Sequence, residues 1–191
     1  MRSSGFTVVE LVVSVSILTV VFWLVSSSFV SGKQAFRTSA SIMEIDADGN
    51  RTMRRIIEAL RGSEEGSISS IPQAPFSSAS ADFQILEPYD GTETPIGPPR
   101  NISLDAQGSV VWVENPGLAN ERTTRWSNDI APMLEGETLN GLDDNGNGLI
   151  DEPGLCFSRN GNLVSVGLTI TTAGPNGPLT RTWTASVHCR N

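Results

Sequence analysis

The stretch Asn140–Glu152 concentrates oxygen-bearing side chains at a spacing suited to holding a metal ion. Aspartate and asparagine alternate with other residues along it, a glycine follows that permits a sharp turn, and the next residue offers its backbone carbonyl. Calcium takes six to eight oxygen ligands at about 2.3–2.6 Å, and a tightly wound loop supplies many of them locally. The pattern predicts a calcium site whose ligands are Asp143, Asn145, Asn147, Leu149, Asp151 and Glu152.

This loop departs from the full EF-hand pattern at its closing position. The bidentate glutamate of that pattern would fall at Gly154, so Asp151 or Glu152 must supply the closing carboxylate, and Asp144 is an alternative ligand. The competing interpretation is an acidic Asn-Gly turn without metal. Against it, the segment Leu134–Glu152 contains six acidic residues and no basic one, and like-charge repulsion disfavours packing them without a cation.

A second candidate is Glu10, a lone carboxylate inside the apolar stretch Phe6–Val30. A helix of that length rises about 37 Å, enough to cross a hydrocarbon core of about 30 Å. A carboxylate near the centre of such a helix costs about 2.5–3.5 kcal/mol, less near the end, so it needs a cationic partner at the same depth. A plain anchor and a cleaved secretory signal are the competing interpretations, and the long apolar region disfavours a cleaved signal.

The residues Gly5-Phe6-Thr7-Val8-Val9-Glu10-Leu11 resemble the processing site of type IV prepilins and of type II secretion pseudopilins. The resemblance joins a Gly-aromatic junction, a glutamate four residues later and a long apolar helix. It implies that a prepilin peptidase cuts between Gly5 and Phe6 and methylates the new Phe6 amine. It also implies that Glu10 pairs with the Phe6 amine of an adjacent subunit, a pairing that low dielectric strengthens.

The same resemblance implies a location and partners. The precursor would cross the inner membrane once, with its globular domain in the periplasm, and then enter a pilus or pseudopilus filament. The implied partners are other pilin or pseudopilin subunits, the prepilin peptidase and an assembly platform in the membrane. Because the first proline is Pro72, no proline breaks the helix near the end of the membrane segment. That favours a minor pilin or a minor pseudopilin, and Arg51–Arg61 also resembles the helix end of J-type minor pseudopilins.

Four segments position these candidates. Residues 1–5 are the expected leader, 6–30 a transmembrane and assembly helix, 31–62 its amphipathic continuation, and 63–191 a β-rich domain that carries the acidic loop 140–152. Apolar residues recur at helical spacing along the amphipathic segment, namely Ala35, Ile42, Ile45, Met53, Ile56, Ile57 and Leu60.

In the β-rich domain the sequence predicts strands at 82–87, 102–104 and 109–114, with a stiff connection through Pro95, Pro98 and Pro99. The clearest hairpin joins residues 164–170 to 182–189, because both halves alternate apolar and polar residues as a sheet packed on a helix requires. We therefore expect an α+β fold, a long N-terminal helix packed on an antiparallel sheet. That is also the pilin fold that the resemblance implies.

The two cysteines of the chain are Cys156 and Cys189. Because the resemblance implies export, and an even pair of cysteines in an exported chain favours a bond, we expect a Cys156–Cys189 disulfide. Two buried thiols are the alternative.

The charge balance and the inventory of reactive groups narrow the function. The chain of 191 residues carries 13 basic and 21 acidic side chains, a formal net charge of −8, which argues against binding nucleic acid. The single histidine, His188, finds no partner for a catalytic triad in the sequence pattern. We expect a structural filament subunit rather than an enzyme. A pilus-displayed adhesion or binding module and a membrane-anchored calcium-dependent enzyme remain the alternatives.

Overall fold

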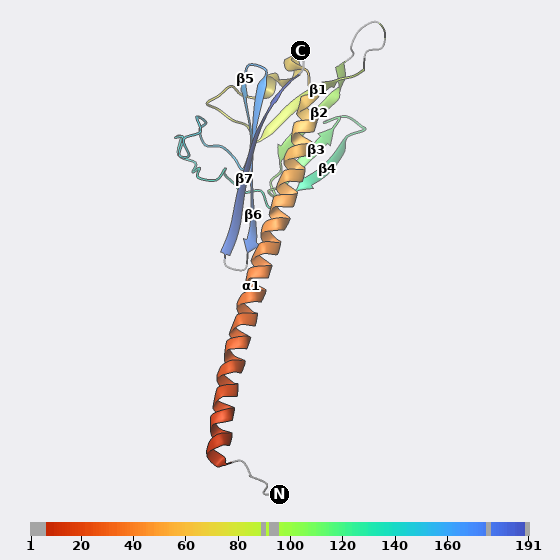
Figure 1. Cartoon of the computed structure of the whole chain (residues 1–191). Coiled ribbons are helices and arrows are strands. Elements are labelled where there is room, and N and C mark those ends of the chain that lie inside the picture. Colours follow the sequence, from red (N-terminus) through yellow and green to blue (C-terminus); the bar gives the residue numbers. More distant parts are fainter. Residues whose placement is uncertain (1–6, 89–90, 92–95, 175–176, 190–191) are drawn as a thin grey trace. The chain divides into compact units, whose positions relative to one another are not determined.

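The computed structural model describes residues 7–88, 91, 96–174 and 177–189 (Figure 1). Its longest element is the single helix α1 (Val8–Arg61), which has 54 residues. The chain divides into two compact units, Met1–Ser41 and Ile42–Asn191, and α1 contributes residues to both.

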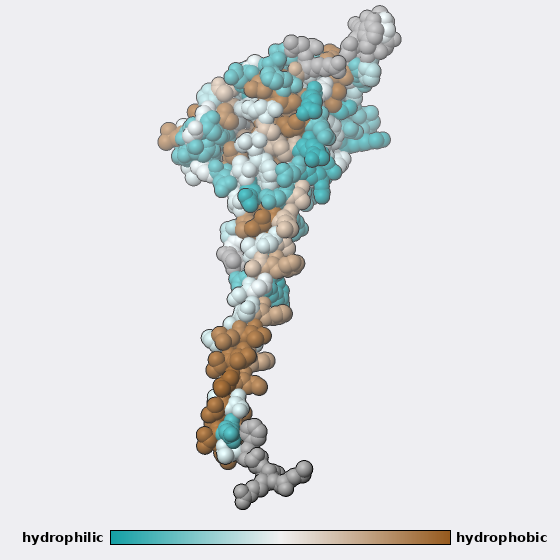
Figure 2. Space-filling model, viewed as in Figure 1, coloured by the Kyte–Doolittle hydropathy of each residue, from teal (hydrophilic) through white to brown (hydrophobic). Residues whose placement is uncertain are grey.

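The first unit contains the N-terminal part of α1, which is mostly apolar as far as Val30. Within the described residues, α1 is the one helix long and apolar enough to cross a membrane, with an 18-residue window of mean hydropathy 2.5, none of it buried. Figure 2 shows mostly apolar side chains on the N-terminal turns of α1, with a hydrophilic patch near the start, whereas hydrophilic and apolar side chains are mixed on the surface of the second unit. This helix is therefore able to anchor the protein in a membrane.

The last turns of α1 belong to the second unit and are amphipathic. The residues that they bury recur every three or four positions, namely Ile45, Gly49, Thr52, Met53, Ile56 and Leu60. The arginines of this stretch, such as Arg54 and Arg55, are exposed. The predicted apolar face is therefore confirmed from Ile45 onward, whereas Ala35 is exposed. The helix ends at Arg61, directly before Gly62.

Two antiparallel sheets, rather than one, pack with these turns. After a short 3-10 helix, η1 (Glu65–Ser70), four strands form a sheet in the order β1-β2-β3-β4: β1 (Ser80–Leu86), β2 (Ile96–Leu104), β3 (Val110–Glu114) and β4 (Arg122–Ser127). The second sheet has the order β5-β6-β7, from β5 (Leu155–Asn160), β6 (Leu163–Gly174) and β7 (Gly177–His188).

The sequence predicts a stiff connection at Pro95, Pro98 and Pro99, but part of this segment is a strand. Pro98 and Pro99 lie in β2, where Pro99 pairs with Gln84 of β1. The pairing between β2 and β3 begins only at Arg100, so the prolines lie where β2 pairs with β1 alone, next to a register irregularity, and strands tolerate proline at such places. Pro95 lies outside the described residues.

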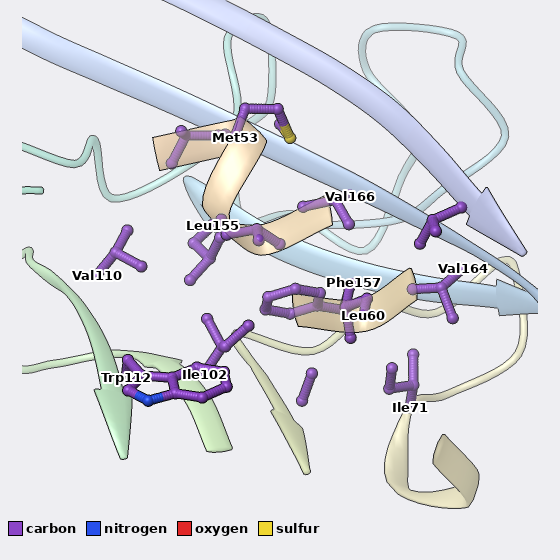
Figure 3. Close-up of a cluster of buried hydrophobic side chains, with 14 of the residues drawn as sticks. Met53, Leu60, Ile71, Ile102, Val110, Trp112, Leu155, Phe157, Val164 and Val166 are labelled. Carbon is purple, nitrogen blue, oxygen red and sulfur yellow. The ribbon is translucent and has the colours of Figure 1, made fainter. Parts of the chain in front are cut away.

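The core lies between the two sheets and the last turns of α1, as the close-up in Figure 3 shows. Leu60 of α1 and Phe157 of β5 lie next to each other there, and Ile102 and Trp112 approach from the other sheet. Val164, Val166 and Leu168 of β6 are buried on the same side, as their alternation predicts. A long helix with antiparallel sheets confirms the α+β class.

Candidate functional site

The start of α1 is fixed by a capping box formed by Thr7 and Glu10. The Oε2 atom of Glu10 accepts the backbone N–H of Thr7 at 2.9 Å and the Thr7 hydroxyl at 2.8 Å, while that hydroxyl oxygen accepts the backbone N–H of Glu10 at 3.3 Å. These bonds satisfy backbone donors that the first helical turn leaves free. The Thr-x-x-Glu spacing is visible in the sequence, and it gives Glu10 a structural role that the sequence analysis missed. The predicted cleavage residues Gly5 and Phe6 lie outside the described residues.

The acidic loop is wound by its own side chains. One oxygen of Asp143 accepts the N–H groups of Gly146 at 2.7 Å and Asn147 at 3.1 Å, and the other accepts the N–H of Gly148 at 2.8 Å. The side-chain oxygen of Asn145 accepts the N–H of Asn147 at 3.0 Å. These Asx turns produce the tight winding that the alternation predicts, but they occupy the oxygens of residues predicted to bind calcium.

The next predicted ligand, Asp151, faces a different part of the loop. Its Oδ1 atom accepts the N–H groups of Asn140 at 2.8 Å and Gly141 at 2.9 Å. Asp144, the alternative ligand, accepts hydrogen bonds from the Thr138 hydroxyl and the Asn140 amide, and the Thr138 bond is the main cause that lowers its pKa. Asp151 and Asp144 therefore tie the two ends of the loop together.

Asn147 links the loop to the interior. Its side-chain oxygen accepts the N–H of Leu149 at 2.8 Å, and its amide donates to Oε1 of Glu152 at 2.5 Å. Glu152 is completely buried. Burial raises the pKa of the Glu152 carboxyl, and the neighbouring Glu137 carboxyl adds to the rise. Glu137 was not among the predicted ligands, although the uncompensated acidic run was the signal that contained it.

The acidic side chains among the predicted ligands are hydrogen-bonded within the loop. Among the residues that the structure describes, no group of three or more acidic, histidine or cysteine side chains is placed to hold a metal ion. The carboxylates of Asp143 and Asp151 bind backbone N–H groups instead, and Glu152 lies with Glu137 beneath the loop. The loop covers one side of the β5–β7 sheet and leaves a cavity of about 660 Å³, lined in part by Asn147 and Glu152.

The sheet register separates the two cysteines, so the structure does not support the predicted disulfide. Both are free and buried. Cys156 lies in one row with Gly167 and Thr184, whereas Cys189 lies five residues beyond Thr184. Five residues place it about 16 Å along the strand and, being an odd number, on the opposite face of the sheet. A disulfide needs Cα atoms about 4.4–6.8 Å apart.

The free thiols are expected to be unreactive in the folded chain. Burial raises the pKa of Cys156 to about 12 and also raises the pKa of Cys189, so little of the nucleophilic thiolate is present at pH 8. Iodoacetamide should alkylate both cysteines in denaturant without prior reduction, and at least about 100-fold more slowly in the native protein, as read by intact mass. If the cysteines are alkylated in denaturant only after reduction, the predicted Cys156–Cys189 disulfide is present.

The structure therefore contains two features that could serve a function. One is a capped carboxylate at the start of an apolar helix, and the other is a buried pair of carboxylates under a tightly wound acidic loop. Similarity to known proteins does not decide between uses for them. No model of a protein family, no curated protein and no solved structure matches this chain.

Proposed function

We propose that this chain is a subunit of a type IV pilus or of a type II secretion pseudopilus, processed by a prepilin peptidase and assembled through its N-terminal helix. The observation that carries the proposal is α1 itself, an uninterrupted helix whose apolar N-terminal part is exposed and whose first turn holds the carboxylate of Glu10. An adhesion module displayed on such a filament is the alternative.

The exposed apolar part of α1 must be covered by something other than this chain. Val8 is 79% exposed and Phe22 71% exposed, and the most apolar window buries nothing. Lipid covers such a surface in the precursor, and neighbouring helices of the same kind cover it in a filament. Only the filament also supplies Glu10 with a cation, the Phe6 amine of an adjacent subunit, because lipid tails provide none.

The capping box leaves room for that second partner. Within the described residues, the hydrogen bonds of the Glu10 carboxylate all go to Oε2, so Oε1 is available to an approaching ammonium group. A glutamine at this position also completes a capping box, because its amide oxygen accepts the same bonds. The cap and the charge are therefore separable by mutation.

The decisive variants are Glu10→Gln and Glu10→Val. If the charge drives assembly, both should insert into the membrane normally and fall at least about 10-fold in sheared filaments, because neither pairs with an ammonium group. Immunoblots of the membrane and filament fractions measure this. Gly5→Glu provides the uncleaved reference for the precursor's size.

Ser16→Ala is the matched control, since it removes a polar group of the same helix, a hydroxyl that donates to the Val12 carbonyl at 2.8 Å. It should assemble like the natural chain. Normal filament levels of Glu10→Gln together with loss of Glu10→Val would reduce Glu10 to a helix cap. If neither variant changes filament levels, or the natural chain is absent from filaments, the proposed function fails.

A further inference from the structure

Two buried carboxylates meet beneath the acidic loop with one oxygen each left over. Glu152 is 0% exposed and Glu137 is 7% exposed. Oε2 of each is buried without a hydrogen-bond partner among the described residues. Leaving a charged oxygen buried and unpaired is costly, so this arrangement needs something between the two side chains.

The other oxygen of each carboxylate holds the loop. Oε1 of Glu137 accepts the backbone N–H of Asn145 at 2.9 Å, and Oε1 of Glu152 accepts the Asn147 amide at 2.5 Å. The backbone joins the segments that carry the two glutamates, since the N–H of Leu134 donates to the Glu152 carbonyl at 2.9 Å and the N–H of Glu137 donates to the Leu134 carbonyl at 3.0 Å. Both side chains are thus held through Oε1, and their backbones are joined by hydrogen bonds, while the Oε2 atom of each is buried.

Among the residues that the structure describes, no basic side chain forms an ion pair with either carboxylate. The ion pairs among the described residues join Arg125 to Asp105 and Arg181 to Asp46, and neither includes Glu137 or Glu152. The remaining ways to compensate two adjacent carboxylates are a shared proton or a bound cation. A cavity of about 660 Å³ lies beside the pair and is lined in part by Glu152 and Asn147.

We propose that Glu137 and Glu152 bind one Ca²⁺ ion through their buried Oε2 atoms and that the ion secures the 143–149 loop against the β5–β7 sheet. The site differs from the one that the loop pattern predicts, because Glu137 replaces Asp143 and Asp151 as the source of carboxylate charge. The inference does not depend on the filament assignment.

The surroundings favour calcium over other divalent ions. Calcium accepts many protein oxygens in flexible geometry, and the loop carries asparagine and backbone oxygens next to the pair, whereas magnesium retains several waters in a strict octahedron. Zinc prefers nitrogen and thiolate ligands. The nearby Cys156 is a buried, protonated thiol.

The test uses the full chain in detergent micelles after chelation with EDTA. One equivalent of Ca²⁺ should bind in calorimetry, and Ca²⁺ at about 100 times its Kd should raise Tm by about 5–10 °C, with a smaller rise for Mg²⁺ at the same concentration. Glu137→Gln and Glu152→Gln should each weaken binding at least about 100-fold. Without metal both variants should match or exceed the natural chain in Tm, because each removes a buried like charge.

Glu135→Gln is the matched control, an acidic residue of the same segment that accepts the Thr182 hydroxyl at 2.9 Å. It should bind Ca²⁺ like the natural chain. The absence of binding and of any Tm change at 5 mM Ca²⁺ would overturn the site and favour a shared proton. Unchanged Ca²⁺ binding by Glu137→Gln would also overturn the proposed site and would favour the loop residues as the ligands. If Glu152→Gln fails to fold, the result for Glu137→Gln alone decides.

Discussion

Replacing Phe157 with alanine is expected to lower the free energy of unfolding by about 3–5 kcal/mol. Phe157 is fully buried and its ring lies at the meeting point of β5, the last turn of α1 and the β1–β4 sheet (Figure 3). The change removes the phenyl ring and leaves a cavity. Three elements would have to move together to close it. Because their backbones are held by separate hydrogen-bond ladders, little collapse is expected and most of the cavity cost remains.

The measurement is denaturant unfolding of the full chain in micelles, followed by tryptophan fluorescence. Phe76→Ala is the matched control, because Phe76 is 62% exposed, and it should cost less than about 1 kcal/mol. Equal costs for the two variants would contradict the placement of Phe157.

Elements with one covered face were predictable from the sequence. In the β6–β7 hairpin, Val164 and Val166 face the core while Ser165 pairs with Ser186 on the other side through their hydroxyls, so period-two alternation is preserved. The end of α1 behaves likewise, because one stripe of it is buried and the opposite one is solvated. Amphipathic periodicity records a single interface, which the end of α1 and the Val164–Val166 part of β6 have, whereas Val166 to Ile170 are buried without interruption.

Strands β4 and β5 lack that signal for opposite reasons. β4 is a sheet edge whose first four residues, Arg122–Arg125, are all exposed, so nothing apolar marks it. In β5 both faces are covered, and Leu155 to Ser158 are buried without interruption. Cys156 faces Leu134 near the acidic loop, while Phe157 faces α1. A short strand covered on both sides resembles any apolar run, so its sequence does not identify it.

The acidic site shows a similar limit. Local alternation correctly indicated a tightly wound loop at Asp143–Asn147, because Asx turns depend on neighbours two to five positions away. The partner of Glu152 depends instead on the pairing of residues 133–134 with 152–153, which only the fold brings together. Glu137 therefore could not be singled out from the six acidic residues of the segment.

Gly154→Ala is expected to cost about 3 kcal/mol, because this glycine lets two backbone segments touch. A methyl group there would overlap the carbonyl oxygen of Ala131 and lie 2.8 Å from its carbonyl carbon. Neither segment is free to retreat, since Gly154 donates to the Pro132 carbonyl at 3.2 Å and accepts the N–H of Thr169 at 2.7 Å. Among small-to-large substitutions, those that overpack against a fixed backbone lower the free energy of unfolding most.

Gly66→Ala is the control for the chemical change itself. Its nearest neighbour would be a Glu64 carboxylate oxygen at 3.4 Å, at the end of a flexible side chain, so the change should alter stability by less than about 1 kcal/mol. Thermal unfolding of both full-length variants compares them. Because Gly154 follows Glu152 by two residues, Gly154→Ala should also weaken Ca²⁺ binding, whereas Gly66→Ala should not. A Gly154→Ala chain as stable as the natural one would mean that the contact between residues 131–132 and 154, which frames the carboxylate pair, is not formed as described.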